Sequence, residues 1–447
     1  MEPIEVRILK KILPSTEEDR RIREVVREVT RTLEEKIAAR GLRAKPLLVG
    51  SVAKGVHLTG TEIDMFVAFP PETPREVLER EGLALGDILE RPVRMYAEHP
   101  YTRGWHGGFE VEIVPCYRIT DATQRMSAVD RTPLHVDYVL GHVKDGQTDE
   151  VRLLKAWCEG IGVYGAEAKV LGFSGYLCEL LILKNATFRG VLENSLSWRP
   201  GTVFEFDRPP ARKFSEPLVV VDPVDPNRNV ASAVGVEQLA TFVHAAREYI
   251  RAPSDRFFFP RPLKPLTLPR LRALAKKRGG GLLTISMPSP AVTEDVLYPQ
   301  LRKAHRAFLD LFDRHEYRVF DSRFDIAGKE AVFLFEFTVD SLPEVSQHPG
   351  PPVWVKNAKE FLAKWARSPK TMGGPFIRGD RWVVDLARGE TSAGALVKAS
   401  WRGLSLGKDL EKTARRSFRI RAGASALGAA YAGAWTRLFD KGFPWLR

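Results

Sequence analysis

The chain has 447 residues, and its 68 Lys and Arg against 56 Asp and Glu give it a formal net charge of +12. Its 44% hydrophobic and 28% charged residues exclude a disordered or low-complexity protein, and its length predicts about two to four domains. The positive surplus suggests a polyanionic partner, either nucleic acid or an acidic membrane surface, although a basic surface without a partner would give the same total.

The cysteines and the apolar segments bear on the compartment. Cys116, Cys158 and Cys178 lie far apart and form neither a CxxC pair nor a cluster at zinc spacing. The charged N-terminus lacks the apolar core of a secretory signal, and the apolar segment 422–435 is too short to span a membrane. We therefore expect a cytoplasmic protein in a reducing environment.

The N-terminal region has the pattern of a helix followed by strands. The run 15–18 has the form of a capping box, and apolar residues recur after it at helical spacing as far as Ile37. One long amphipathic helix is therefore expected to open the fold. Strands are predicted for residues 46–49, ahead of a turn at Gly50-Ser51, and for 62–69 and 109–115.

The pattern becomes helical from about residue 148, and the run 175–183 is too apolar for an exposed helix. Five prolines between Pro253 and Pro269 predict a domain boundary there. Beyond it, an α+β region is predicted from a basic helix at 270–278, a strand at 282–287, a helix at 293–315, and strands around 317–324 and 331–339.

Acidic residues on two otherwise apolar strands are the chemical anomaly of the sequence. Glu62 and Asp64 share one strand face, and burying two neighbouring carboxylates is costly unless a cation compensates. Glu112 lies on the second strand, and Gly50-Ser51 would let phosphate oxygens approach the backbone. Such acids suit two Mg²⁺ ions that clamp an in-line phosphoryl displacement. An edge strand with its acids in water remains the alternative on this pattern alone.

The turn, the spacer and the strand that begins Glu62-Ile63-Asp64 resemble the signature of the nucleotidyltransferase superfamily that includes DNA polymerase beta. Longer strings, which run from about residue 45 to about residue 300, narrow the resemblance to the archaeal, class I CCA-adding enzymes. These strings are VGSVAKGVHLTGTEIDMFVAF, YAEHPYTRG, VEIVPCY, SAVDRTPLH, EVRLLKAWC, GVYGAEAKVLGFSGYLCELL, VVDPVDPNRNVA and LYPQL.

The resemblance implies an α+β multidomain fold. It consists of a polymerase beta-like nucleotidyltransferase head over 1–145, built from a mixed sheet with helices, a helical central domain over 146–257, and an α+β RNA-binding region over 258–447. The implied activity is template-independent addition of the 3′-terminal CCA of tRNA from CTP and ATP, with Mg²⁺ as cofactor and release of pyrophosphate. A poly(A) polymerase-like enzyme and a catalytically inactive RNA-binding relative remain alternatives. A membrane-surface role is disfavoured because no anchor is present.

The resemblance also assigns residues. Glu62 and Asp64 match the catalytic, metal-binding carboxylates, and Glu112 stands where the family usually has Asp. The extra methylene of Glu112 is expected to lower activity or shift metal preference, and Glu110 on the same face is the weaker substitute. The matching nucleotide-binding positions are Ser51 and Lys54 for the triphosphate, His135, Lys155 and Tyr164, and Arg228 for the base edge. Lys54 stands where the family often has Arg, and it would bind only as a point charge. His99 and Asp130-Arg131 lie in matching strings.

The basic charge is concentrated near the C-terminus, where residues 401–447 hold ten Lys and Arg against three acids. Upstream of them, basic and aromatic residues interleave at Trp354, Phe361, Lys364, Trp365, Arg367, Phe376, Arg378, Arg381 and Trp382. Such groups would suit the acceptor stem and T arm of tRNA, an RNA duplex recognised by shape. For any single helix, a solvated amphipathic face is the alternative. A homodimer is also compatible with the sequence.

Overall fold

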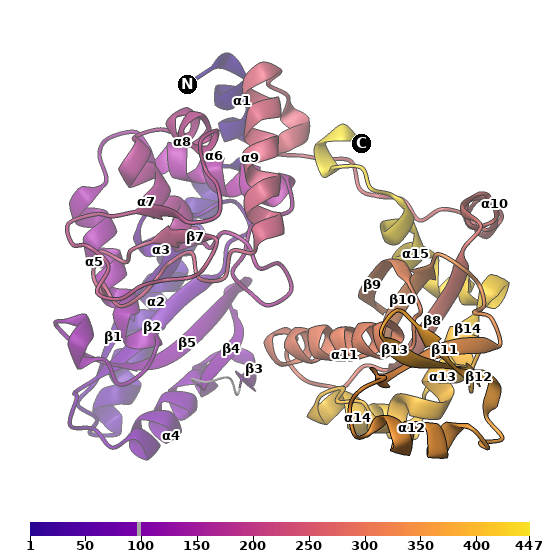
Figure 1. The fold of residues 1–447 in the computed structure, drawn as a ribbon. Helices are drawn as coiled ribbons and strands as arrows, with labels where there is room; N and C mark the ends of the chain where they lie inside the picture. Colours follow the sequence, from indigo (N-terminus) through magenta and orange to yellow (C-terminus); the bar gives the residue numbers. More distant parts are fainter. Residues whose placement is uncertain (96–99) are drawn as a thin grey trace. The chain divides into compact units, whose positions relative to one another are not determined.

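The computed structural model describes residues 1–95 and 100–447, which form two compact units (Figure 1). The first comprises Met1–Pro262 with Phe443–Arg447, and the second comprises Leu263–Gly442. The division falls within the proline-rich segment between Pro253 and Pro269. The finer division of the sequence at residues 145 and 257 remains a prediction.

Two helices open the first unit. α1 (Pro3–Ile12) precedes α2 (Thr16–Ala39), so the expectation that one long helix opens the fold is wrong. A capping box between Glu2 and Glu5 begins α1, whose apolar side packs against the core around α6 (Gln147–Gly160). α2 begins as predicted, because the backbone N–H of Glu18 donates to Ser15 Oγ at 3.1 Å.

A five-stranded mixed sheet forms the centre of the N-terminal half of this unit. Its strands lie in the order β1 (Lys45–Leu48), β2 (Ile63–Phe69), β5 (Phe109–Tyr117), β4 (Tyr101–His106) and β3 (Glu90–Met95). β2 and β5 are parallel, and the other neighbours are antiparallel. The three predicted strands are present, whereas the sequence analysis did not predict β3 or β4.

The two faces of this sheet have different neighbours. Ile63, Met65 and Val67 of β2 join a core with α2 and with α4 (Arg75–Leu85). Further along β2, Phe66 and Ala68 pack on the opposite face against Val136 of α5 (Thr132–His142). Because successive residues of a strand alternate between faces, Asp64 shares the face of Phe66 and lies away from α2 and α4.

The rest of the first unit is mainly helical. Its elements are α3 (Gly50–Ala53) in the β1–β2 connection, and then α6, α7 (Gly175–Asn185), α8 (Phe188–Ser195), β6 (Thr202–Phe204), β7 (Leu218–Val220) and α9 (Val236–Arg251). Trp157 of α6 packs edge-on against Phe242 of α9, and both lie in one buried cluster. The loop after β7 contains Asp222, Asp225 and Arg228, and both aspartates are buried.

The second unit contains an antiparallel sheet with helices on both faces. Its strands lie in the order β14 (Arg419–Ala422), β8 (Gly281–Pro288), β10 (Glu330–Phe337) and β9 (Val319–Ala327). One face packs against α11 (Glu294–Arg314), α13 (Ala393–Ser400) and α14 (Lys408–Arg416), and the other against α10 (Leu268–Arg278) and α15 (Ala432–Phe439).

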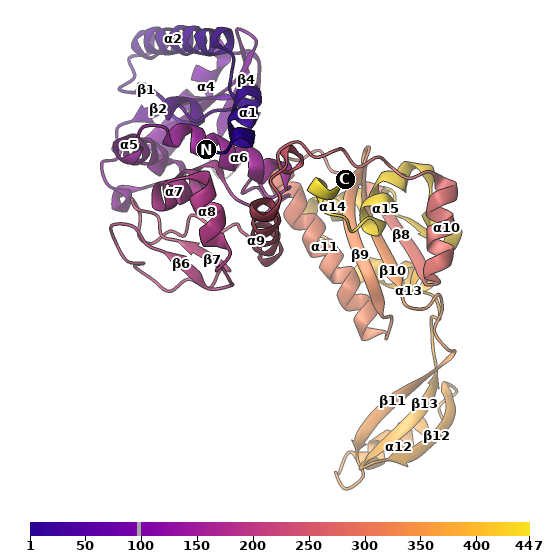
Figure 2. The ribbon, with the colours of Figure 1, turned by 90° about the horizontal axis from the view of Figure 1, so that it is seen from above.

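A smaller sheet projects from the four-stranded one (Figure 2). It has the order β11 (Val345–Pro352), β13 (Arg381–Ala387) and β12 (Thr371–Arg378), and it packs with α12 (Ala358–Trp365). The basic and aromatic residues singled out in the sequence lie here, and Trp354 is 73% exposed. Among the described residues, no helix is long and apolar enough to cross a membrane.

Candidate functional site

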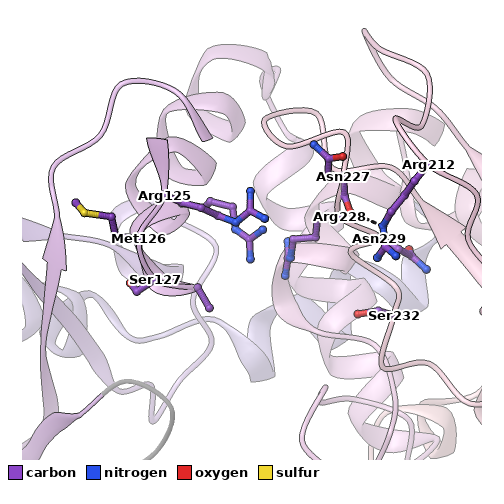
Figure 3. Close-up of a pocket in the computed structure, with 10 residues that line it drawn as sticks. Arg125, Met126, Ser127, Arg212, Asn227, Arg228, Asn229 and Ser232 are labelled. Atoms are coloured by element: carbon purple, nitrogen blue, oxygen red, sulfur yellow. Dashed lines mark hydrogen bonds between the residues drawn. The ribbon is translucent and has the colours of Figure 1, made fainter. Parts of the chain in front are cut away.

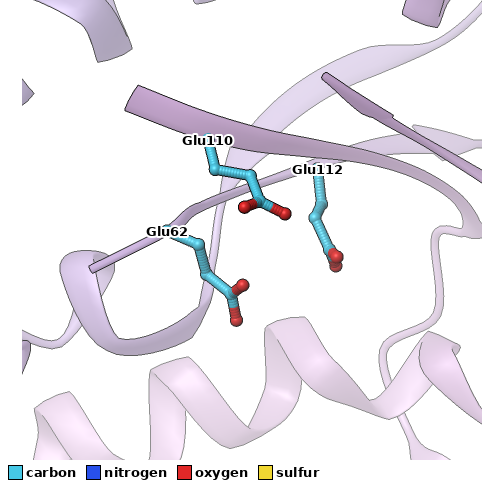
Figure 4. A group of neighbouring side chains, drawn as sticks. All are labelled: Glu62, Glu110 and Glu112. Atoms are coloured by element: carbon cyan, nitrogen blue, oxygen red, sulfur yellow. The ribbon is translucent and has the colours of Figure 1, made fainter. Parts of the chain in front are cut away.

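Acidic side chains from two adjacent strands converge at one end of the sheet of the first unit. Asp64 of β2 is in direct register with Glu112 of the parallel strand β5. Glu62 immediately precedes β2, and Glu110 lies two residues before Glu112 on the same face of β5. Figure 4 shows the carboxyl groups of Glu62, Glu110 and Glu112 directed into one space. Carboxylate oxygens of these three glutamates lie within 4.8 Å of one another, a spacing that could hold a metal ion.

Asp64 is half-buried, and it lies against Gly50. A Cβ atom on Gly50 would overlap the Asp64 carboxylate, and Gly50 also has a φ of +68°. Glycine is thus required for two reasons, the left-handed backbone and the close approach of Asp64. Burial, followed by the charges of Glu62 and Glu112, raises the pKa of Asp64 to about 7.

Glu62 shares this electrostatic environment. Burial, and then the negative charge of Glu112, raises its pKa, while the positive charge of Arg103 acts in the opposite direction. Arg103 lies on β4 directly opposite Glu112, and its Nε and Nη2 donate to Glu112 Oε1 at 2.8 and 2.6 Å. The same Nε lies 3.0 Å from Glu110 Oε1. Arg103 thus contacts two of the four carboxylates directly, Glu110 and Glu112, and among the described residues the cluster retains an excess of negative charge.

Two lysines that the sequence assigns to nucleotide binding meet at one buried glutamate. Lys54 Nζ donates to Glu179 Oε2 at 2.5 Å, and Lys155 Nζ donates to Glu179 Oε1 at 3.0 Å. Burial acts to raise the pKa of Glu179, but the charges of Lys155 and Lys54 lower it overall. The positive charges of Lys54 and Lys155 also act on Asp64, so this group adjoins the acidic cluster.

Ser51 and Tyr164 lie close to these charged groups. Ser51 is in α3, directly after Gly50, and its hydroxyl is 3.3 Å from the Thr61 hydroxyl. Tyr164 is paired with Phe173 by an isolated β-bridge. The hydroxyl of Tyr164 and Nζ of Lys155 both lie beside Gly175, where an added Cβ atom would approach them at 3.1 and 3.5 Å.

His135 and Arg228 meet at another buried carboxylate, Asp222. His135 Nε2 lies 3.0 Å from Asp222 Oδ2, to which Arg228 Nη1 also donates at 2.8 Å. The His135 ring stacks on Tyr176 with a centroid distance of 4.1 Å, and Lys54 Nζ lies 5.7 Å from the centre of the Tyr176 ring. Burial lowers the pKa of His135, which favours the neutral imidazole despite the opposing effect of Asp222.

An arginine-lined pocket of about 420 Å³ opens beside Arg228 (Figure 3). Its arginines are Arg125, Arg131, Arg212 and Arg228. Asp225 Oδ2 accepts from Arg131 at 2.7 Å and lies 3.2 Å from Arg125. Buried Nε of Arg131 has no hydrogen-bond partner in the described part of the chain. A pocket with this excess of donors suits an anionic ligand that carries oxygen acceptors.

The structure thus places the predicted site residues in three neighbouring groups of one unit, with Glu62, Asp64 and Glu112 in the first. The cluster whose ligand atoms lie closest together contains Glu110 rather than Asp64, and the ligand set predicted from the sequence remains a prediction. Asp130 is buried and accepts from the backbone N–H groups of Tyr117, Met126 and Ser127, which is a structural role. His99 lies outside the described residues.

The sequence analysis did not identify Arg103. It also did not identify Glu179, Asp222 and Asp225, the carboxylates that pair with the basic residues of the site. Glu179 had a detectable signal, because a lone glutamate in the otherwise apolar run 175–183 must be buried with a partner. Asp222 and Asp225 also follow an apolar strand, but their partners His135 and Arg131 lie 87 and 94 residues away in the chain. No local pattern could have identified those pairs.

Three family models match successive parts of the chain. Residues 30–135 match a nucleotidyltransferase domain, residues 149–259 match the second domain of tRNA nucleotidyltransferase, and residues 278–423 match the C-terminal domain of the CCA-adding enzyme. The acidic cluster lies within the first match, and Glu179 and Asp222 lie within the second.

Curated relatives match over nearly the whole chain. A CCA-adding enzyme of Methanoregula boonei is 37% identical over 100% of this chain and 97% of its own length. The CCA-adding enzymes of Thermoplasma acidophilum and Methanothermobacter thermautotrophicus are 35% and 38% identical, over 91% and 92% of both chains.

Proposed function

The chain belongs to the CCA-adding enzyme family, a group of tRNA nucleotidyltransferases, and we propose that it builds the 3′-terminal CCA of tRNA from CTP and ATP without a template. The observation that supports this chemistry best is the register of β2 and β5, which sets Asp64 beside Glu112 with Glu62 next to them. Carboxylates on adjacent strands can hold cations between the attacking hydroxyl and the nucleotide phosphates.

The acidic cluster suits Mg²⁺ in particular. Its ligands are hard carboxylate oxygens, which Mg²⁺ prefers, and it usually takes one or two of them together with substrate phosphates. The excess negative charge of the cluster and the raised pKa of Asp64 are both features that a bound cation would compensate. We assign Glu62, Asp64 and Glu112 as the ligands. A metal held by these residues would supply Lewis-acid chemistry, which would lower the pKa of the primer 3′-hydroxyl and stabilise the departing pyrophosphate.

The lysine pair is assigned to the triphosphate. Lys54 and Lys155 adjoin Asp64, and because they share one carboxylate partner, Glu179, the group has one excess positive charge. Each ammonium group has three donors, so it can keep its bond to Glu179 and still donate to a phosphate oxygen. The hydroxyl groups of Ser51 and Tyr164 complete the assigned contacts.

The group around Asp222 is assigned to the nucleobase. Asp222 fixes both Arg228 and His135, and 32% of the Arg228 side chain remains exposed. A guanidinium has five N–H donors, so Arg228 can bind Asp222 and still donate to acceptors on a base edge. The pocket beside it, with four arginines, would bind a backbone phosphate of the tRNA 3′ end.

The remaining proposals concern the rest of the molecule. The exposed aromatic and basic residues around Trp354 and α12 are assigned to the acceptor stem and T arm, because stacking and phosphate contacts suit RNA. We also propose that the enzyme acts in the cytoplasm, where tRNA matures. A homodimer is proposed as its assembly, and light scattering of the purified protein would show a mass of about 50 kDa instead if the chain is a monomer.

The decisive experiment uses the purified full chain with a tRNA transcript that lacks its CCA. CTP and ATP are supplied singly and together with Mg²⁺, and the product 3′ ends are sequenced. We expect CC with CTP alone and CCA with both nucleotides. Long adenylate tails without CTP incorporation would instead identify a poly(A) polymerase-like enzyme. Binding of tRNA without any incorporation would identify the inactive RNA-binding relative.

A further inference from the structure

Arg103 and Glu112 form an ion pair between two strands of the sheet that carries the acidic cluster. The two residues are directly opposite on the antiparallel strands β4 and β5. Nε and Nη2 of Arg103 both donate to one oxygen of Glu112, Oε1. We propose that Arg103 is a positioning residue for the acidic cluster, one that holds Glu112 by Oε1 and thereby presents Oε2 to the metal. This inference rests on the proposed function of the cluster as a metal site.

The length of the Glu112 side chain explains why this position needs a support. Glutamate has one more rotatable bond than aspartate, so its carboxylate can occupy more positions and must lose more freedom on binding a cation. A misplacement of about 1 Å in a catalytic geometry can cost on the order of a hundredfold in rate. Two charge-assisted hydrogen bonds to one oxygen remove most of that freedom.

The position of Arg103 at the back of the cluster suits this role. Ligating carboxylates are normally oriented by hydrogen bonds from groups that do not touch the metal. Arg103 comes from β4, whereas Glu62 and Asp64 approach from the other side of β5, on the segment that contains β2. Its charge also acts on Glu62, and its Nε lies 3.0 Å from Glu110 Oε1, so it offsets repulsion among the glutamates.

Two other roles for Arg103 predict different results. A guanidinium that substitutes for the cation would compete with the metal, and its removal would then strengthen metal binding. A structural ion pair at the protein surface would matter little to metal binding, because 42% of the Arg103 side chain is exposed and exposed ion pairs contribute little. A positioning role alone predicts weaker metal binding that depends on the glutamate at 112.

The test is a double-mutant cycle on the full chain, with Mn²⁺ as the probe. Mn²⁺ affinity is measured by calorimetry and electron paramagnetic resonance for the wild type, Arg103→Gln, Glu112→Asp and the double variant. We expect Arg103→Gln to weaken Mn²⁺ binding by about tenfold or more in the Glu112 background, within the range for supporting residues of metal sites. In the Glu112→Asp background, the same change should have less than about a twofold effect, because the shorter side chain does not need the support.

Matched variants separate positioning from folding. Arg103→Lys keeps the charge but lacks the two-donor fork, so it should give an intermediate loss and serves if Arg103→Gln is unstable. Arg94→Gln removes a similarly exposed, ion-paired arginine from the neighbouring strand β3 and should leave Mn²⁺ affinity unchanged. Thermal unfolding of each variant shows whether the fold is retained.

Three outcomes would overturn the inference: unchanged Mn²⁺ binding in Arg103→Gln, tighter binding in that variant, or an equal loss in both backgrounds. The failure of the proposed function is distinguishable, because it would appear as a wild-type protein that adds neither CMP nor AMP to tRNA. Under the inference, kcat for CMP addition should fall in Arg103→Gln while KM for CTP changes little, because Arg103 acts through Glu112 and not on the nucleotide.

Discussion

Asp64, which is half-buried, and Asp222, which is fully buried, are aspartates of the same unit whose surroundings shift their pKa in opposite directions. Burial and the charges of Glu62 and Glu112 raise the pKa of Asp64 to about 7. Burial acts in the same direction on Asp222, but its hydrogen bonds with His135 and Arg228 and the positive charge of Arg228 lower its pKa to about 2. Asp222 therefore has basic partners among the protein's own side chains, whereas the strongest charges acting on Asp64 are the carboxylates of Glu62 and Glu112, a difference that suits its proposed role as a metal ligand.

Replacing each aspartate by asparagine should have opposite consequences for stability, and the change at Asp64 should have the larger effect on catalysis. Asp64→Asn removes a carboxylate whose ionisation is disfavoured in the fold. We expect CMP addition to fall by at least about a thousandfold, since a bound metal supplies several kcal/mol to the transition state. With a chelator present, we expect the free energy of unfolding to rise by on the order of 1–3 kcal/mol.

Single-turnover assays and urea unfolding measure these two effects on the same protein. Glu62→Gln is the companion variant, with the same directions expected and a smaller gain in stability, because Glu62 is more exposed than Asp64. Activity of Asp64→Asn within tenfold of the wild type would refute the metal assignment. If Asp64→Asn instead lowers the free energy of unfolding in the presence of the chelator, the fold itself already stabilises the ionised Asp64 carboxylate.

The contrast between the two aspartates also explains what the sequence could and could not predict. The acids on β2 and β5 were predictable because a strand places alternate residues on one face, so local spacing carries the information. The partners of Asp222 come from Arg228, six residues away, and from His135, 87 residues away, so only the tertiary fold defines that environment. The sequence analysis assigned Arg228 and His135 through family resemblance and not through their shared carboxylate.

The same distinction applies to the fold. The helices α2 and α11 were predicted because one buried face dominates each of them, and β2 was predicted because its apolar residues are buried on both faces of the sheet. β11 and β12 were missed, because Pro349, Pro352 and Pro375 interrupt their patterns and few of their residues are buried. α1 was missed because it is only 10 residues long.

Gly50 offers a way to disturb Asp64 without changing the carboxylate. In Gly50→Ala, the new Cβ atom must displace Asp64, and the positive φ adds roughly 1–2 kcal/mol of backbone strain. We expect nucleotide addition to fall by about ten- to a hundredfold, as for a catalytic group misplaced by about 1 Å. Gly55→Ala is the matched control, because Gly55 has a φ of +63° and nothing within 4 Å of an added Cβ.

Both glycine variants should lose similar stability in urea unfolding, and only Gly50→Ala should lose the large factor in kcat. Equal kinetic losses in the two variants would mean that strain in the turn, and not contact with Asp64, matters for catalysis. Such a result would argue against a catalytic requirement for a precisely positioned Asp64 carboxylate at this end of β2.

Asp222→Asn tests the aspartate that is paired with side chains of the protein itself. A shift of the Asp222 pKa from 3.8 to about 2 corresponds to about 2 kcal/mol of stability, which we expect the variant to lose at pH 7. Because the pKa in the fold lies below its ordinary value, this stabilisation is fully present above about pH 4 and is lost as the pH falls through about 2. KM for CTP and ATP should also rise, since Arg228 and His135 lose their anchor.

Urea unfolding at pH 7 measures the stability change, and Asp207→Asn serves as its control. Asp207 is exposed and accepts a hydrogen bond from the Tyr138 hydroxyl, so its replacement should change the free energy of unfolding by about 0.5 kcal/mol or less. Unchanged stability in Asp222→Asn would contradict the idea that the fold itself satisfies this carboxylate.

Substitutions in the arginine pocket are expected to have the smallest effects. They extend the comparison to arginines with and without a carboxylate partner. Arg125 lies 3.2 Å from Asp225, whereas Arg212 donates to an uncharged partner, the carbonyl of Asn227. Arg212 thus has more of its charge available to a phosphate, so Arg212→Ala should weaken tRNA binding more than Arg125→Ala. We expect losses of roughly three- to tenfold and a shallower salt dependence, by about one ion per arginine that contacts a phosphate. Filter binding between about 50 and 200 mM salt measures both quantities.

Arg31→Ala on α2 removes an exposed, ion-paired arginine and controls for net charge. If all three variants shift the affinity equally with the same salt slope, the pocket contributes only to the general positive field and holds no phosphate of its own.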